Sequence, residues 1–319
     1  MADVRGAALL ASVLLVSFAA AQQKPIPIIF DTDIGDDIDD ALALALALQS
    51  PELDVRAVTT VVDDVESRTR LAWKELGLFG RRDIPLAAGA PEPLLDAVRN
   101  NRSRQYEVLT PSDEFPAAAK RRAAQLIIDT LMNSREKLTV VPVGPLTNIA
   151  LALKTEPRIK SKIERIVLMG GAFFPPRAEY NIYRDRIAAE IVFRSGVPVT
   201  AVGLDVTEKC KLQGADLDRL RSAKNPASQF LVRLIELWQN GRSDQYPTLH
   251  DPLAVASTLR PGLIETQLGQ VEVETSSPLT FGTTVFKRGS GPTHVARDVN
   301  VREFLDLFVE RLSLPPRGR

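Results

Sequence analysis

The segment Ile26–Leu48 reads IPIIFDTDIGDDIDDALALALAL and carries six aspartates between Asp31 and Asp40. The β-branched run before Asp31 is typical of a buried strand. The Ala/Leu run after Asp40 alternates as a strand would, but acidic residues at its start favour a helix, because they satisfy free N–H groups and suit the positive end of a helix. The segment therefore predicts a strand that leads through an acidic loop into a helix.

Strand and helix signals continue to alternate along the chain. Apolar runs such as LDVRAVTTVV, KLTVVPVGP and IERIVLMGG predict strands, and each is followed by a segment with a helical pattern. This order implies a mostly parallel central sheet flanked by helices on both faces. Because no internal repeat or linker divides the sequence, we expect a single large, Rossmann-like α/β domain over residues 22–319.

Three later segments complete the predicted fold. Residues 91–116 are polar and contain several prolines, which is typical of a surface excursion, and PAAAKRRAAQLIIDTLMNS then predicts a helix. VEVETSSPLTFGTTVF predicts strands, and VREFLDLFVERL predicts a last helix. His294 lies between them in GSGPTHVARD, where we expect a surface or loop position.

Composition narrows the possible functions. The 319 residues include 40 Lys+Arg and 40 Asp+Glu, so the formal net charge is zero and nothing in it indicates a nucleic-acid or membrane partner. Cys210 is the only cysteine, which excludes an internal disulfide and a cysteine metal cage.

The N-terminus resembles a targeting segment. AALLASVLLVSFAAA follows a weakly positive start, and Ala19 and Ala21 are small residues at the spacing that a signal peptidase accepts. The apolar run is shorter than the roughly 20 residues of a membrane span, which argues against an uncleaved anchor. We therefore expect residues 1–21 to be a signal peptide, and the mature protein to be periplasmic or secreted.

The six aspartates need a compensating positive charge, because each carboxylate raises the cost of ionising its neighbours. One helix N-terminus offsets only part of this repulsion. A hard divalent cation such as Ca²⁺ or Mg²⁺ prefers oxygen ligands and would offset more of it. The alternative is a solvated capping loop with spare acids.

Two known metal motifs can be compared with this loop. An EF-hand that begins at Asp31 would need glycine at its sixth place and glutamate at its twelfth, where this chain has Asp36 and Leu42. A haloacid-dehalogenase-type phosphatase would use Asp31 as nucleophile and Asp33 as acid. This alternative stays open, but it assigns no role to the later aspartates.

Further polar motifs follow predicted strands, where ligands of parallel α/β folds bind. VGPLTNIA follows one strand and places the Val143 carbonyl before a turn. LMGG ends another strand and is followed by Glu179, Tyr180 and Asn181. TLHDP places His250 beside Asp251.

Together, D-T-D-x-G, D-D-A-L-A, V-G-P-L-T-N-I-A, L-M-G-G, E-Y-N and H-D-P resemble the inosine-uridine preferring nucleoside hydrolase family over nearly the whole mature chain. The resemblance implies the nucleoside hydrolase fold. It also implies Ca²⁺-dependent hydrolysis of the N-glycosidic bond of ribonucleosides, through an oxocarbenium-like transition state. A homodimer or homotetramer is expected on the same ground.

The resemblance also implies site residues. Family members have one residue between the glycine and the paired aspartates, and this chain has three, so the pair is matched to Asp39 and Asp40. The implied Ca²⁺ ligands are Asp33, Asp40, Asp251 and the carbonyl of Val143. The implied substrate contacts are Asp39, Asp64, Glu179, Asn181 and Asp251. Asp33 would be the general base, and His250 the general acid that protonates the leaving base.

The chain departs from the family pattern at three places. VVDDV replaces the Gly-Asn that often follows the second strand, and Asp64 is matched to that Asn. The loop AFFPPRA is short and lacks the expected ribose-binding Asn, so Arg177 is a candidate for the 5′ end of the sugar. Asp185-Arg186-Ile187 stands where the family tends to have D-P-E.

Aromatic residues near H-D-P are candidates for stacking on the base. Trp238 and Tyr246 precede His250, although Trp238 also has the spacing of a core residue, as does Trp73. Three functions stay open from the sequence: a ribonucleoside hydrolase, a ribosyl-compound binding protein without turnover, and a phosphatase that uses Asp31 and Asp33.

Overall fold

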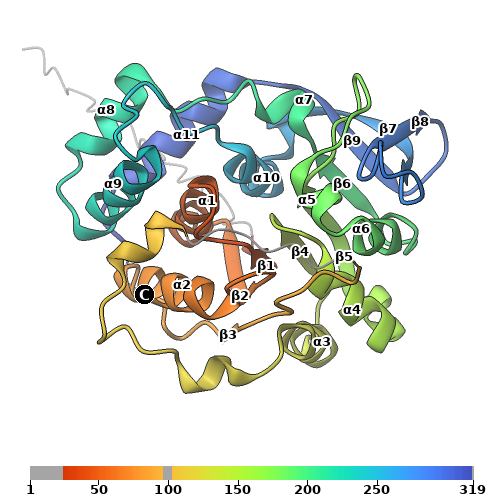
Figure 1. Cartoon of the computed structure of the whole chain (residues 1–319), viewed down its shortest axis with the longest axis horizontal. Helices are drawn as coiled ribbons and strands as arrows, with labels where there is room; N and C mark the ends of the chain where they lie inside the picture. The colour runs from red at the N-terminus through yellow and green to blue at the C-terminus, as the bar shows by residue number, and fades with distance from the viewer. Residues whose placement is uncertain (1–23, 96–102, 318–319) are drawn as a thin grey trace, which may run out of the picture.

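A computed structural model describes residues 24–95 and 103–317, and the predicted signal peptide lies outside these ranges. Within them, nine strands form one sheet in the order β3-β2-β1-β4-β5-β6-β9-β7-β8 (Figure 1). The pairs from β3 to β9 are parallel, and β7 pairs antiparallel with β8 and β9. This confirms the predicted single α/β domain with a mostly parallel sheet.

The strands are β1 (Ile26–Thr32), β2 (Leu53–Thr60), β3 (Leu86–Ala87), β4 (Leu138–Pro142), β5 (Ile163–Met169), β6 (Val199–Val202), β7 (Ile264–Val273), β8 (Thr284–Arg288) and β9 (Thr293–Val299). The α-helices are α1 (Asp39–Gln49), α2 (Val65–Leu78), α3 (Ala123–Asn133), α4 (Thr147–Thr155), α5 (Tyr180–Arg184), α6 (Arg186–Phe193), α7 (Leu204–Thr207), α8 (Gly214–Ser222), α9 (Pro226–Gln239), α10 (His250–Leu259) and α11 (Val301–Ser313). The 3₁₀ helices are η1 (Arg104–Val108), η2 (Ala117–Lys120), η3 (Pro157–Lys162) and η4 (Pro261–Leu263).

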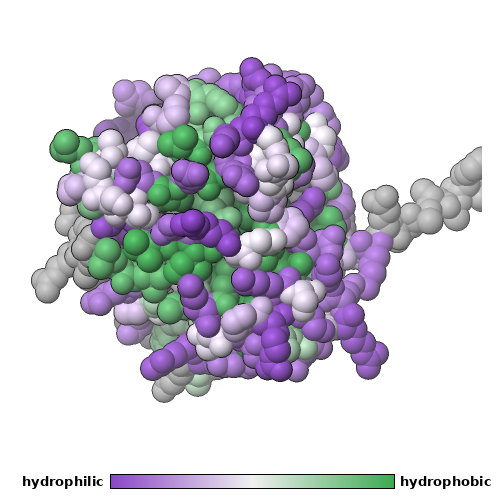
Figure 2. Space-filling model, turned by 90° about the vertical axis from the view of Figure 1, so that its right-hand side faces the viewer, coloured by the Kyte–Doolittle hydropathy of each residue, from purple (hydrophilic) through white to green (hydrophobic). Residues whose placement is uncertain are grey.

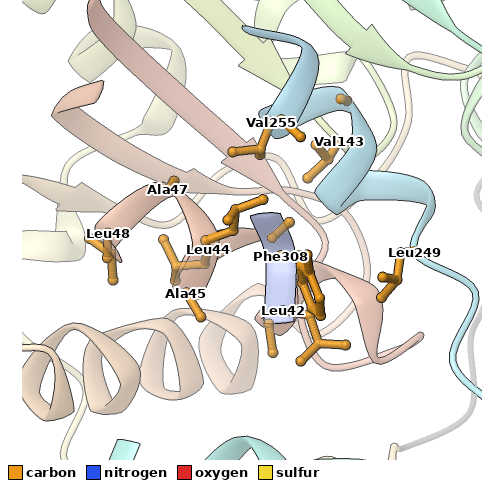
Figure 3. Close-up of a cluster of buried hydrophobic side chains, with 14 of the residues drawn as sticks. Leu42, Leu44, Ala45, Ala47, Leu48, Val143, Leu249, Val255 and Phe308 are labelled. Carbon is orange, nitrogen blue, oxygen red and sulfur yellow. The ribbon is translucent and has the colours of Figure 1, made fainter. Parts of the chain in front are cut away.

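Helix α1 is buried on every side. All eleven of its residues are buried, which explains why its Ala/Leu alternation shows no polar face. It packs against α10 and α11, and Figure 3 shows Leu42 and Leu44 gathered with Val255 of α10 and Phe308 of α11. The acidic loop therefore enters the most enclosed helix of the described chain, and the two acids of its first turn are fixed at the sheet edge.

The other face of the sheet carries a second apolar core. Helices α3, α4 and α6 lie on the side of the sheet opposite to α1, α10 and α11 (Figure 1), and their apolar residues pack on β4, β5 and β6. Since both faces are covered, the central strands are apolar along most of their length, as the sequence predicted.

The region after β3 differs from the predicted surface excursion. Helix η1 packs back onto the acidic loop, with Gln105 and Tyr106 buried. The Gln105 amide donates to the carbonyls of Asp36 and Asp37 at 3.1 and 2.8 Å. The helix predicted next is interrupted: η2 is a 3₁₀ turn, and α3 begins only at Ala123.

The C-terminal strands also differ in part from the prediction. The segment around His294, expected as a surface or loop position, forms β9, which lies between β6 and β7 while the His294 side chain is exposed. Figure 2 shows the side of the molecule that carries β7 and β8, where hydrophobic residues gather in one area of the surface with hydrophilic residues around it. Over residues 24–95 and 103–317, the structure contains no helix with the length and apolarity needed to span a bilayer.

Candidate active site

A cavity of about 470 Å³ opens where the parallel strands end, within the size range of small-molecule sites. Its walls come from the loop after β1, the ends of β4, β5 and β6, and the starts of α1, α5 and α10. It is lined by Asp33, Asp36, Asp37, Asp39, Asp40, Val143, Met169, Glu179, Tyr180, Asn181, Leu204, Trp238, His250 and Asp251. The structure thus brings together most of the residues that the resemblance implies, from segments more than 200 positions apart.

Three carboxylates converge at the floor of this cavity. Asp39 and Asp40 begin α1, Asp251 lies in the first turn of α10, and each is only 3% exposed. One carboxylate oxygen from each lies within 4.8 Å of the others. The Asp251 backbone N–H donates to Asp39 Oδ2 at 3.1 Å, and the Thr32 hydroxyl donates to Asp40.

Asp33 lies directly against the turn after β4. A Cβ added at Gly144 would lie 2.5 Å from Asp33 Oδ1, so the glycine of the V-G-P turn permits this approach. The neighbouring Val143 carbonyl accepts a 2.6 Å hydrogen bond from the Asn181 amide. Asp33 and the Val143 carbonyl therefore border the same end of the cavity as the predicted ribose contacts.

Glu179 is held by backbone donors on both sides. Its Oε1 accepts from the Asn181 N–H at 2.9 Å, and its Oε2 accepts from the N–H groups of Gly171 and Ile182 at 3.1 Å. This caps α5, a helix that the sequence analysis did not predict, and ties it to the glycines after β5. The carboxylate is thereby oriented at the cavity wall.

The acids titrate abnormally because they are buried together. Burial raises the pKa of Asp33 to about 7, with Arg68 opposing this shift and Asp36 adding to it. Burial also raises the pKa values of Asp39, Asp40 and Asp251 well above the ordinary range, and their mutual repulsion adds to the effect. The protein therefore holds these groups at a distance where their ionised forms require a nearby cation.

Arg68 supplies one such cation, and no motif in the sequence predicted this role. The side chain is 1% exposed, donates to the carbonyls of Val62 and Ile34 at 2.9 and 3.1 Å, and lies 3.7 Å from Asp63. It joins the loops after β1 and β2 behind the cavity. A charged residue on the inward face of the amphipathic α2 is the sequence signal that could have revealed it.

The three converging acids offer carboxylate oxygens, which are the ligands that Ca²⁺ and Mg²⁺ prefer. The predicted ligands Asp33, Asp40, Asp251 and the Val143 carbonyl all line the cavity. Asp33 is not among the three acids whose oxygens lie within 4.8 Å of one another. The cluster Asp39, Asp40 and Asp251 is the group of the described residues that could hold a metal ion.

His250 begins α10 and lines the cavity opposite the end of β6. Its Nδ1 lies 2.7 Å from the hydroxyl of Thr207, the last residue of α7. Burial lowers the pKa of His250 to about 4, and Glu208 acts in the opposite direction. The ordinary pKa of a histidine side chain is near 6.5, so the imidazole of His250 favours its neutral form more than a free histidine does.

Several predicted residues lie elsewhere. Asp64 is exposed, and its side chain caps α2 by accepting from the Ser67 N–H at 3.0 Å. The two left-handed residues of this loop are Val62 and Asp63, at φ 51° and 57°. Glycine and asparagine adopt this conformation readily, and a β-branched residue such as Val62 rarely does. Asp64, which was matched to the family's Asn, does not line the cavity. Asp63 pairs with Arg184.

Asp31 and Arg177 are also outside the cavity lining. Asp31 is fully buried, and its Oδ1 accepts from the Thr59 hydroxyl and the Asn148 amide. This position gives a substrate no access to its carboxylate, contrary to the phosphatase hypothesis. Arg177 is exposed and pairs with Glu208 at 2.8 Å.

Of the aromatic candidates, Trp238 lines the cavity and also packs partly against the core, so its stacking on a base stays a prediction. Trp73 is partly buried against the same core. Tyr246 is exposed and does not line the cavity, whereas Tyr180 does.

Comparison with known proteins agrees with this geometry. The family model described as inosine-uridine preferring nucleoside hydrolase matches residues 28–306. The pyrimidine-specific ribonucleoside hydrolases RihA of Citrobacter koseri and Salmonella typhimurium are 39% and 40% identical over 308 residues, which cover 90% of this chain and 98% of each relative.

Solved structures give the same result. The plant nucleoside hydrolase PpNRh1 matches with a TM-score of 0.78 and 29% identity, over 92% of this chain and all of that chain. The purine-preferring ribonucleoside hydrolase from Gardnerella vaginalis matches with a TM-score of 0.76 and 31% identity, over 90% and 98% of the two chains. The shared fold, the matched range and the acids gathered at the strand ends agree, and the chain belongs to the inosine-uridine preferring nucleoside hydrolase family.

Proposed function

We propose that the protein hydrolyses the N-glycosidic bond of ribonucleosides to free base and ribose, and that it does so with Ca²⁺. The observation that carries this proposal is the convergence of Asp33, Asp39, Asp40 and Asp251 with Glu179, Asn181 and His250 in one cavity. Such a set offers acceptors for sugar hydroxyls and a polar group for the departing base. The family relationship supports the same reaction class.

Different residues of the cavity have different roles in the hydrolysis of the N-glycosidic bond. The C1′–N bond breaks with its electron pair on the base, which leaves as an anion and takes up a proton from solvent, and water supplies the new C1′–O bond. Asp33 takes the proton that the water loses. Buried carboxylates around the ring stabilise the positive charge that develops on the ribosyl group. Glu179 and Asn181, fixed by backbone hydrogen bonds, position the sugar.

Asp33, Asp40, Asp251 and the Val143 carbonyl would hold the cation. When bound, Ca²⁺ would orient a water molecule and make it more acidic. Calcium is favoured over zinc because the donor set contains carboxylate and carbonyl oxygens, with no thiolate. Elemental analysis of protein purified without chelator tests this assignment, and a metal-free protein with full activity would contradict it.

The preference for a nucleobase is best tested with both pyrimidine and purine nucleosides. The RihA relatives are named as pyrimidine-specific, whereas the Gardnerella structure is named as purine-preferring. Because identity is higher to the RihA proteins, we propose uridine and cytidine as the first substrates and inosine as the comparison.

One incubation separates the hypotheses. The purified protein is given uridine, inosine and nitrophenyl phosphate, and release of ribose and of phosphate is measured. Ribose release supports the hydrolase. Nucleoside binding without ribose release would favour the binding protein, and phosphate release would favour the phosphatase.

The cellular location and the oligomeric state of the protein are also proposals. A cleaved signal peptide would deliver the protein to the periplasm or outside the cell, and N-terminal sequencing of the protein recovered there tests it. A homodimer or homotetramer is expected from the family resemblance, and light scattering after gel filtration measures it.

A further inference from the structure

In the hydrogen bond between Thr207 and His250, the surrounding structure determines which group donates and which accepts. The Thr207 hydroxyl lies 2.7 Å from His250 Nδ1, and Thr207 is fully buried. Either group could donate. If the imidazole donated, the hydroxyl proton would need a different acceptor.

Among the described residues, His250 Nδ1 is the sole hydrogen-bond partner of the Thr207 hydroxyl. A buried donor without an acceptor costs about 1–3 kcal/mol. The arrangement that satisfies both groups has the hydroxyl donating to an unprotonated Nδ1. The ring proton then lies on Nε2, the other nitrogen.

Thr207 is held firmly in place. Helix α7 begins against the glycines after β5, where the Leu204 N–H donates to the Gly171 carbonyl at 2.8 Å. The Asp205 carboxylate accepts from the N–H groups of Phe173 and Phe174 at 2.9 and 2.7 Å. The hydroxyl is therefore presented to His250 by a helix that is anchored at both its backbone and its side chains.

We propose that Thr207 is a positioning residue that fixes His250 as the Nε2–H tautomer, so that His250 donates a hydrogen bond to a nitrogen or carbonyl oxygen of the departing base. The proposal rests on the proposed function for its substrate. It requires no proton transfer from His250: the N–H stabilises the negative charge that the base gains as the C1′–N bond breaks, as an oxyanion-hole donor does.

Kinetics of three variants test the role. Thr207→Val keeps the shape and removes the hydroxyl, Thr207→Ser restores it, and Thr130→Val removes a hydroxyl that bonds Leu126 on the far side of the sheet. We expect Thr207→Val to lower kcat on the best nucleoside about five- to tenfold, the value of one intramolecular hydrogen bond, with little change in KM. Thr207→Ser and Thr130→Val should stay near wild type.

A substrate whose leaving group needs no hydrogen bond sharpens the test. Thr207→Val should cleave nitrophenyl riboside at nearly the wild-type rate. Equal losses on both substrates, or an equal loss in Thr207→Ser, would show that Thr207 acts only through the fold and would overturn the proposal.

The tautomer itself can be observed without turnover. The chain has only two histidines, so ¹⁵N-histidine NMR gives two ring systems, and His294→Gln assigns them. We expect the Nε2–H tautomer of His250 in the wild type and in Thr207→Ser, and a mixture in Thr207→Val. A wild-type Nδ1–H tautomer would overturn the proposal. Absence of any nucleoside cleavage would instead overturn the proposed function, and the NMR result would distinguish the two failures.

Discussion

Asp33 lies where one carboxylate can serve both a cation and a water molecule. It borders the cavity, touches the Val143–Gly144 turn and lies in the same cavity as four other buried acids: Asp39, Asp40, Glu179 and Asp251. Asp33→Asn keeps the shape and one oxygen but removes the proton acceptor. We expect kcat on the best nucleoside to fall by about 10²-fold or more, while KM changes little. Steady-state kinetics on uridine or inosine measure both values.

Asp31→Asn is the matched control for this prediction. Asp31 is equally buried in the same strand end, but it bonds Thr59 and Asn148 and does not line the cavity. Its substitution should therefore reduce turnover less than Asp33→Asn does. Loss of activity in Asp31→Asn, with Asp33→Asn still active, would contradict the assignment and favour Asp31 as the reacting group.

His250→Ala should distinguish between leaving groups. Removing the ring removes a donor to the departing base, and one such donor is typically worth about 10²–10³ in kcat. We expect that loss on inosine or uridine and a much smaller one on nitrophenyl riboside. Parallel losses on both substrates would instead assign His250 to sugar positioning.

At these positions, the sequence was informative where a residue belongs to a short contiguous motif. Asp33, Asp40, Val143 and Asp251 follow from motifs that are contiguous in the chain. Thr207 and Arg68 could not be predicted in the same way, because their roles depend on partners from other segments. Thr207 acts on a histidine 43 positions later, and Arg68 contacts a carbonyl 34 positions earlier.

At the level of elements, the contact between α1 and α2 contains a buried acid. Glu75 of α2 is fully buried, and its carboxyl oxygens have no hydrogen-bond partner at normal distance among the described residues. Burial raises its pKa well above the ordinary 4.5, while the nearby Ala45 backbone opposes the shift. The folded protein therefore keeps Glu75 protonated at pH values where the unfolded chain ionises it.

The raised pKa of Glu75 predicts that the free energy of unfolding falls as the pH rises. Below about pH 4.5 both states carry the proton, and Glu75 has no effect on pH dependence. As pH rises above that value, the unfolded state is favoured and stability falls. We expect Glu75→Met to raise the free energy of unfolding at pH 8 by about 1–3 kcal/mol, and by less at pH 5. Urea titration at both pH values, with Glu75→Gln as the polar uncharged control, measures the difference.

How accurately each strand or helix was predicted depends on how many of its residues are buried. The central strands are apolar enough to be recognised from sequence, and α1 was recognised from the acidic residues at its start. Strand β9 was missed because only Thr293, Val295 and Ala296 of it are buried, and Arg297 and Asp298 interrupt the apolar pattern. Helix α5 was missed because it is short and depends on the Glu179 cap, which forms only when β5 and its glycines are in place.

At the scale of the whole molecule, the cation should act as a structural ligand. The converging acids repel one another in the folded chain, so an ion that binds only the folded state should raise its stability. At a concentration 100 times its dissociation constant, Ca²⁺ should add about 2.7 kcal/mol. We expect the melting temperature to rise with Ca²⁺ and to fall with chelator, as measured by calorimetry.

The control is a variant that lacks a ligand. Asp251→Asn should show little response of melting temperature to Ca²⁺, because one of the four proposed ligands is weakened. If the wild type and this variant respond equally, the stabilising ion is bound elsewhere.

The enclosure of α1 has a kinetic consequence. Amide hydrogens exchange with solvent only when their segment opens, and a helix with no exposed residue opens last. The α1 amides should therefore exchange only through global unfolding, whereas those of η1 and the β7–β8 hairpin should exchange through smaller fluctuations. Asp39 and Asp40 thus belong to α1, the helix expected to open last. The distance between their carboxylates therefore persists while the outer elements fluctuate.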